Sequence, residues 1–458
     1  MSVTLSAALA YAQENQPRFL SELIEFVSIP SVSTDPRAKT DIQRAAQWVA
    51  GQLQHLGMSK VQVLPTAGHP VVYGEHLDAG PGKPVVLIYG HYDVQPAEPL
   101  ELWHSPAFEP QQRGESLYGR GASDMKGQVM VALKAVESLL QTGNLPINLK
   151  WLIEGEEEIG SPNLGMFIQE NKELLACDFA INPDTGMIAP GVPTITYGLR
   201  GLAYFELRVQ GPAHDLHSGL FGGSVHNPAQ VLCELIAGMH DPEGRVTLPG
   251  FYDRVRPLEA AERQELSRLP TNDVFYLEQT GAPVLFGEAG YSAVERVGGR
   301  PTLEINGLLS GFTGEGTKTV LPAKAMAKIS MRLVPDQDPY EVERQLRRYL
   351  EEHAPNTIRW ELLLHSAAPA SIGDIHMPAV KALAQALEDT WGKRPIYKRE
   401  GGSVPVVAQM QSILGVESVM TGFGLPDDNL HAPNEKIHLP TYFKGVEVFI
   451  RYLVLLGD

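Results

Sequence analysis

The sequence predicts an α/β protein in which a mostly parallel sheet, flanked by helices, carries a smaller inserted α+β domain. Apolar runs typical of buried strands alternate with helical patterns over residues 1–197, and the same texture returns over 375–458. Several of these strand-like runs end abruptly in His, Asp or Glu. Between residues 198 and 374 the pattern changes to alternating strands and amphipathic helices, which indicates a separate domain.

The first domain opens with helices and continues with strands that each finish in a polar segment. Helical spacing of apolar residues covers 18–28 and 41–56, and we expect both helices to cover the sheet. The run 85–90 is apolar and β-branched, as in buried parallel strands. The other elements predicted for this domain are strands within 147–161, 177–186 and 417–436, a Gly-rich turn feeding a helix over 117–143, and a helix at 378–392.

The inserted domain alternates strands with amphipathic helices. Its predicted elements are a strand at 194–211, a helix at 227–241, a strand at 323–335, a helix at 338–354 and a strand at 357–365. The stretch 240–301 is rich in Pro and Gly and shows no pattern that places its elements.

Composition limits the partners. A chain of 458 residues that is 43% hydrophobic can bury a large core. The net charge of −17 would repel phosphate backbones and anionic lipids, so we expect neither nucleic acid nor membrane partners. The two cysteines, Cys177 and Cys233, exclude a disulfide scaffold. The first 20 residues resemble an amphipathic helix more than a signal peptide, and a cytoplasmic location is the default expectation.

Polar residues gather at the predicted strand ends. They are His91, Asp93, Glu157, Glu158, Asp184 and His431, with Asp124 at the start of a helix. Each alone has an ordinary explanation as a loop that caps a strand, or for Asp124 as a helix N-cap. Two imidazoles with three or more carboxylates suit zinc, manganese or cobalt and exceed the needs of one tetrahedral ion. The pattern therefore favours two metals that share a carboxylate, as in two-metal hydrolases.

Seven segments of the chain form a further pattern. They are GHYDVQP (90–96), GRGASDMKG (119–127), EGEEEIGS (154–161), DLHSG (215–219), MRLVP (331–335), REGGSVP (399–405) and HAPNEK (431–436). In this order they resemble the M20 metallopeptidases, and among them the branch of cytosolic dipeptidases that includes the carnosine dipeptidases.

The resemblance implies roles for the polar cluster. Asp124 is expected to bridge two divalent ions per subunit, taken first as Zn²⁺ with Mn²⁺ or Co²⁺ as alternatives. His91 and Asp184 would complete one ion site, and Glu158 and His431 the other. Two further residues have catalytic roles by the same resemblance, Asp93 in orienting His91 and Glu157 as the general base. Glu156 matches a position without a catalytic role, and we expect it to be a solvated charge.

The resemblance also implies that the inserted domain is a ferredoxin-like lid and dimerisation domain. His217 would act in the active site of the neighbouring subunit of a homodimer and stabilise the oxyanion. Arg332, Thr319, Gly402 and Ser403 would bind the terminal carboxylate of a small peptide substrate. The alternatives are an ordinary outward strand residue for Arg332 and a plain tight turn at Gly402 and Ser403.

The predicted activity is metal-dependent hydrolysis of the peptide bond in dipeptides or short peptides with a free C-terminal carboxylate. An N-acyl-amino-acid deacylase of the same family is the alternative, because specificity pockets diverge faster than metal ligands. A two-metal phosphoesterase and a non-catalytic peptide-binding scaffold are further alternatives. The complete set of metal and base residues weighs against the scaffold.

Overall fold

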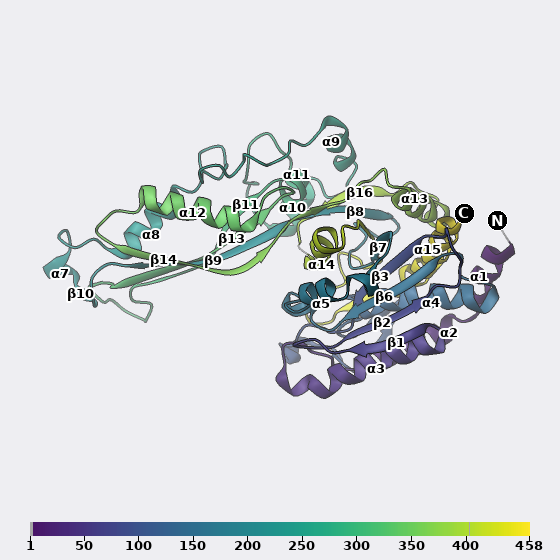
Figure 1. Ribbon diagram of the computed structural model, residues 1–458. Helices are drawn as coiled ribbons and strands as arrows, with labels where there is room; N and C mark the ends of the chain where they lie inside the picture. Colours follow the sequence, from purple (N-terminus) through teal and green to yellow (C-terminus); the bar gives the residue numbers. More distant parts are fainter. Residues whose placement is uncertain (1–2, 403) are drawn as a thin grey trace. The chain divides into compact units, whose positions relative to one another are not determined.

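The computed structural model describes residues 3–402 and 404–458 (Figure 1). The chain divides into two compact units. Unit 1 comprises Met1–Tyr197, Gly373–Lys398 and Val404–Asp458, and unit 2 comprises Gly198–Ile372 and Arg399–Ser403. Residues 399–402, which the predicted division assigns to the first domain, cluster with unit 2. The domain boundaries at 197/198 and 374/375 stay a prediction.

The centre of the large sheet is the predicted set of parallel strands. They are β3 (Val85–His91), β6 (Asn148–Glu154), β7 (Phe179–Asn182) and β17 (Ser418–Met420). They lie side by side in the order β6-β3-β7-β17, and each adjacent pair is parallel. Nearly all of their residues are buried, because helices or other chain segments cover both faces.

Antiparallel strands extend this sheet on both sides, so the sheet as a whole is mixed. On one side β2 (Val71–His76) joins β6 and β1 (Ser59–Leu64) joins β2. On the other, β8 (Thr194–Leu199) joins β17 and pairs with the short strands β15 (Ser371–Ile372) and β16 (Ile396–Glu400). The predicted α/β class is confirmed, whereas β1 and β2 were not predicted.

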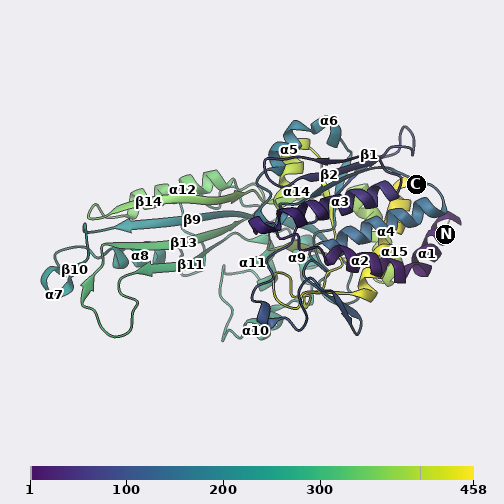
Figure 2. The same ribbon diagram turned by 90° about the horizontal axis from the view of Figure 1, so that it is seen from below.

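Helices cover this sheet. The main ones are α1 (Val3–Glu14), α2 (Gln16–Val27), α3 (Lys39–His55), α4 (Lys126–Thr142), α13 (Pro378–Trp391) and α15 (Leu439–Gly457), with the shorter α5 (Leu164–Glu170), α6 (Lys172–Leu175) and α14 (Pro405–Gln409). Figure 2 shows α2, α3 and α4 on one face of the sheet. Helix α4 is buried throughout residues 126–139 and packs against α1, α15 and β3. A helix that is apolar on most sides fits this central place, and it holds the segment before Lys126 against the sheet.

Unit 2 contains a four-stranded antiparallel sheet. Its main elements are β9 (Gly201–Gln210), α8 (Pro228–Ala237), β11 (Thr302–Ser310), β13 (Lys324–Leu333), α12 (Pro339–His353) and β14 (Arg359–Ala368). The strand order is β11-β13-β9-β14, so the fourth strand along the chain lies beside the first. This βαββαβ order is the predicted ferredoxin-like arrangement. Alternate residues of β13 are buried, and with α8 and α12 they form the core of unit 2.

Two details of unit 2 differ from what the sequence predicts. The stretch without a pattern contains three short helices, α9 (Ala260–Leu266), α10 (Asp273–Thr280) and α11 (Ala293–Gly299). Helices of seven or eight residues are too short for a clear apolar period. The single strand predicted at 194–211 is β8 and β9, which are separated at Arg200. Within the described ranges no helix is long and apolar enough to cross a membrane.

Candidate metal centre

The predicted polar strand ends meet at one edge of the sheet. His91 is the last residue of β3, and Asp184 follows β7 by two residues. Glu157 and Glu158 begin the short 3-10 helix η3 (Glu157–Ile159) that follows β6. His431 lies in the loop after β17. Because these four strands are adjacent and parallel, their carboxyl ends bring the polar side chains together.

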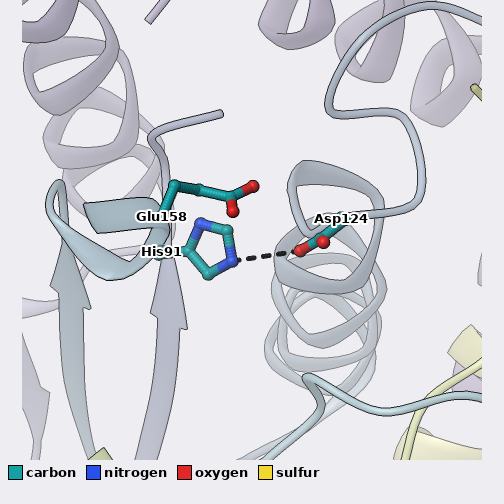
Figure 3. A group of neighbouring side chains, drawn as sticks. All are labelled: His91, Asp124 and Glu158. Atoms are coloured by element: carbon teal, nitrogen blue, oxygen red, sulfur yellow. Dashed lines mark hydrogen bonds and ion pairs between the residues drawn. The ribbon is translucent and has the colours of Figure 1, made fainter. Parts of the chain in front are cut away.

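Asp124 stands between the two imidazoles. Its Oδ1 lies 3.2 Å from Nε2 of His91, and its Oδ2 lies 2.9 Å from Nε2 of His431. The close-up shows this carboxylate facing His91, with Glu158 beside the imidazole (Figure 3). The N-cap position of α4 is Met125, and no side chain caps the helix there. The peptide bond between Asp124 and Met125 is cis. The N-cap alternative for Asp124 is therefore wrong.

Two overlapping donor groups surround His91. Potential ligand atoms of His91, Asp124 and Glu158 lie within 4.8 Å of one another, as do those of His91, Glu157 and Asp184. His431 joins the first group, because its Nε2 lies 3.2 Å from Oε2 of Glu158. The two groups contain nitrogen and carboxylate donors only, which suits a divalent cation of borderline character.

Without a cation, the negatively charged carboxylates of this cluster lie close together and repel one another. Burial, together with the neighbouring negative charge of Asp124, raises the pKa of Asp184 to about 7. Burial likewise raises the pKa of Glu157 well above its usual range, with Asp184 and Glu158 adding to the effect. Burial would also raise the pKa of Asp124, but the hydrogen bonds from His431 and His91 hold it below its usual range. A bound cation would offset this crowding of negative charge, so the donor set fits a metal.

Asp93 connects the end of β3 to η3. Nδ1 of His91 lies 3.0 Å from the Asp93 carbonyl oxygen and 3.4 Å from its Oδ1. The two carboxylate oxygens of Asp93 also accept the backbone N–H groups of Glu157 and Glu158, at 3.3 and 3.1 Å. Asp93 thus contacts both the imidazole and the turn that carries two of the carboxylates. Its predicted role in orienting His91 agrees with this geometry, since a ligating imidazole usually donates its second N–H to an oxygen.

The prediction that Glu156 is a solvated charge is wrong. The residue is 4% exposed, and its carboxylate accepts the backbone N–H of His69 at 3.0 Å and the side-chain amide of Asn163 at 2.9 Å. The neighbouring backbone approaches so closely that a Cβ on Gly68 would lie 1.7 Å from a Glu156 oxygen. Three consecutive glutamates suggest repulsion and solvation, but a distant loop at His69 and the nearby Asn163 satisfy this carboxylate.

Two residues near the cluster had no role in the sequence analysis. The side-chain amide of Gln95 donates to Oε2 of Glu158 at 2.9 Å and to its carbonyl at 3.1 Å. Glu435 accepts the backbone N–H of Asp124 at 3.0 Å. Both lie inside segments already singled out, GHYDVQP and HAPNEK. Their position within those two segments is the feature of the sequence that could have indicated a role at the site.

Other predicted site residues belong to unit 2. His217 ends β10 (Leu216–His217), is exposed, and accepts the Gly219 N–H on Nδ1 at 3.0 Å. The strand β10 pairs with β12 (Val320–Leu321), and the carbonyl of Thr319 accepts the Ser218 N–H at 3.0 Å. His217 therefore ends one strand of this two-stranded sheet, and Thr319 directly precedes the other.

Arg332 and the 402–403 turn complete the predicted set. Arg332 is half-buried on β13, and burial lowers its pKa. The Gly402 carbonyl accepts the backbone N–H of Arg200 at 3.1 Å, and Nε of Arg200 donates to the Gly401 carbonyl, also at 3.1 Å. Ser403 lies outside the described residues.

The chain is similar to known proteins over nearly its whole length. Residues 87–454 match the model of peptidase family M20/M25/M40. A Cys-Gly metallodipeptidase of Candida albicans is 30% identical over 97% of this chain and 96% of its own. The human Beta-Ala-His dipeptidase is 32% identical over 99% of this chain and 93% of its own. The structure of an M20 family metallo-carboxypeptidase from Sulfolobus solfataricus is 34% identical and superposes with a TM-score of 0.85, covering 96% of this chain and 99% of the other.

Proposed function

Because the chain belongs to peptidase family M20/M25/M40 and is a metal-dependent dipeptidase of that family, we propose that its two donor groups hold two divalent cations and that Glu157 is the general base. The substrates are dipeptides or very short peptides that carry a free C-terminal carboxylate. The alternative activity within the family is removal of an acyl group from an N-acyl amino acid.

The position of Asp124 is the observation that carries this proposal. Its two oxygens face two different imidazoles, His91 on Oδ1 and His431 on Oδ2. Asp184 lies 3.9 Å from His91, and Glu158 lies 3.2 Å from His431. One carboxylate shared between two such pairs is the arrangement that two-metal hydrolases use. Asp124, His91 and Asp184 would hold one cation, and Asp124, Glu158 and His431 the other.

The cations have a defined chemical contribution. When bound, they act as Lewis acids that polarise the scissile carbonyl and lower the pKa of water. The donor set of imidazole and carboxylate suits Zn²⁺ first, and Mn²⁺ or Co²⁺ as alternatives.

Glu157 is well placed for proton transfer. Its backbone is fixed by Asp93, while its side chain lies in the donor group of His91 and Asp184 without pairing with His431. Burial raises the pKa of Glu157 in the metal-free cluster, and a general base is most effective when its pKa lies near the working pH. In the proposed mechanism Glu157 takes a proton from the attacking water and passes it to the leaving amine. Asp93 keeps His91 and the Glu157 backbone in place during this transfer.

Unit 2 provides the proposed substrate-binding residues. Arg332 is a planar, permanently charged donor that suits a carboxylate, and we assign Gly402 and Ser403 to the same anion. Thr319 lies beside His217, so we propose that it reaches this anion from the neighbouring subunit. We further propose a homodimer in which His217 stabilises the oxyanion in the neighbouring subunit's site. Support for a second copy comes from β11, an edge strand whose Leu308 and Leu309 are each 58% exposed.

A cytoplasmic location is proposed because Cys177 and Cys233 are free thiols, as is usual in a reducing compartment.

A substrate panel tests the activity. Protein stripped with a chelator should be inactive, and return of Zn²⁺, Mn²⁺ or Co²⁺ should restore cleavage of dipeptides. Dipeptides with an amidated C-terminus should be poor substrates, because they lack the anion that Arg332 would bind. The measurement is amino-acid release from matched dipeptides, amidated dipeptides and N-acetyl amino acids. Faster hydrolysis of the N-acetyl series would favour the deacylase, and no hydrolysis with any metal would reject the proposal.

Mixing inactive variants tests the shared site. His217→Ala and Glu157→Ala proteins should each be inactive alone and should regain activity after subunit exchange. In a two-fold dimer, random pairing restores about a quarter of the sites, because one site of each mixed dimer contains both intact residues. Activity and the fraction of mixed dimer, measured by native mass spectrometry, are followed together. Complete exchange without recovered activity would show that His217 acts in its own subunit or not at all.

A further inference from the structure

A buried carboxylate outside the proposed mechanism lies against the backbone of Asp124. Glu435 is 0% exposed and directly precedes the short strand β18 (Lys436–His438). This strand pairs with β5 (Ser116–Tyr118), and the Gly119 N–H donates to the Glu435 carbonyl at 2.9 Å. Because β5 leads into the segment that contains Asp124, the pairing places Glu435 beside that segment.

Both oxygens of Glu435 are fully used. Oε1 accepts the backbone N–H groups of Ser123 and Asp124, each at 3.0 Å. Oε2 accepts the backbone N–H of Gly121 at 2.9 Å and Nη1 of Arg120 at 2.7 Å. Three of the four donors are backbone groups, so this carboxylate determines the path of the turn that presents Asp124.

Arg120 connects the same carboxylate to the segment that follows His91. The guanidinium is 1% exposed, and its Nη2 donates to the Pro96 carbonyl at 3.0 Å. Pro96 lies five residues after His91, and Glu435 lies four residues after His431. The buried Arg120–Glu435 pair therefore joins the three segments that carry His91, Asp124 and His431.

We propose that Glu435, held by Arg120, is a positioning residue that sets the metal affinity of the site by fixing the orientation of the Asp124 carboxylate. This inference rests on the proposed two-metal function. Asp124 must present Oδ1 towards His91 and Oδ2 towards His431 at the same time. Without an acceptor for its N–H groups the turn would relax, and one of the two orientations would be lost. Partners that support a ligand in this way usually change metal affinity by roughly 10- to 100-fold.

The test substitutes Glu435→Gln and measures zinc binding. Glutamine keeps one acceptor oxygen but replaces the other with an NH₂ group, which is a donor. In one orientation this NH₂ group faces the Gly121 N–H and Arg120, and in the other it faces the N–H groups of Ser123 and Asp124. The metal-free variant is titrated with Zn²⁺ in competition with a chromophoric chelator, and its melting temperature is recorded. We expect zinc affinity to fall by roughly 10- to 100-fold in a folded protein. Affinity within twofold of wild type would overturn the proposal.

A matched control separates positioning from general stability. Glu137 is another buried carboxylate of unit 1, 2% exposed, and it accepts Nζ of Lys134 at 2.8 Å. It lies eleven residues beyond Lys126 along α4, which is about 16 Å of helix. Glu137→Gln should lower the melting temperature and leave zinc affinity unchanged. An equal loss of affinity in both variants would overturn the proposal.

Two further variants complete the test. The double variant Glu435→Gln/Arg120→Met removes the uncompensated Arg120 charge, so thermal stability should recover while zinc affinity stays low. Recovery of both together would mean that the pair is only structural. If Glu435→Gln does not fold, Glu435→Asp replaces it, because a shorter carboxylate keeps the charge but cannot reach all four donors. Wild-type affinity in that variant would overturn the inference, whereas wild-type protein that binds no zinc would overturn the proposed function instead.

Discussion

Glu157→Gln should retain both metal ions and lose turnover by roughly 10²- to 10⁴-fold, the usual contribution of a general base. The amide cannot accept the proton of the attacking water, and the backbone contact from Asp93 to residue 157 does not depend on this side chain. KM should change little, since Glu157 has no proposed contact with the terminal carboxylate. Steady-state kinetics on one dipeptide, with metal content measured on the same sample, provides the comparison.

The neighbouring glutamate is the control for this substitution. Glu156→Gln makes the same chemical change in a buried residue whose contacts are His69 and Asn163. It should lower stability and retain most of the turnover. Near-normal turnover in Glu157→Gln would remove the base assignment, and equal losses in both variants would mean that the turn itself had been disrupted.

Asp124→Asn should remove the shared ligand and cause the largest loss of metal. The amide offers one neutral oxygen in place of two charged ones, so at least one cation should be lost or bound far more weakly. Lewis-acid stabilisation of the transition state is worth several kcal/mol. Because each 1.36 kcal/mol corresponds to a tenfold change in rate, the turnover should fall by about three orders of magnitude. Metal content after dialysis and dipeptide cleavage are measured together.

Asp427→Asn is the corresponding control. Its side chain is 71% exposed and pairs with Lys436, in the same loop as His431. The variant should bind metal and cleave dipeptides as the wild type does. Two ions bound by Asp124→Asn with wild-type affinity would contradict the bridging role.

The site was predictable where the pattern is local to a strand end. The strands β3, β6 and β7 are short apolar runs that stop at His91, Glu157 and Asp184, and an open sheet collects such ends at one edge. Asp124 was ambiguous from the residues alone, because an Asp before a helix is commonly an N-cap. Only the position of its two oxygens between two imidazoles distinguishes the readings.

What the sequence could not predict depends on contacts between distant segments. Glu156 is buried because a loop 87 residues earlier approaches it, and nothing in three consecutive glutamates indicates that loop. Glu435 is similar, since its partners lie more than 300 residues away. Strand β1 was not predicted because it is largely exposed and lacks a regular alternation. Strand β2 is a short buried run interrupted by Gly74, and it belongs to the sheet through its pairing with β6 on one side and β1 on the other.

The claim that Asp124 bridges two cations is tested most directly by anomalous scattering from crystals of the zinc-loaded protein. We predict two peaks per chain, about 3.5–4 Å apart, one in contact with each oxygen of Asp124. The first should also contact His91 and Asp184, and the second Glu158 and His431. A single peak, or two peaks that do not both contact Asp124, would contradict the account.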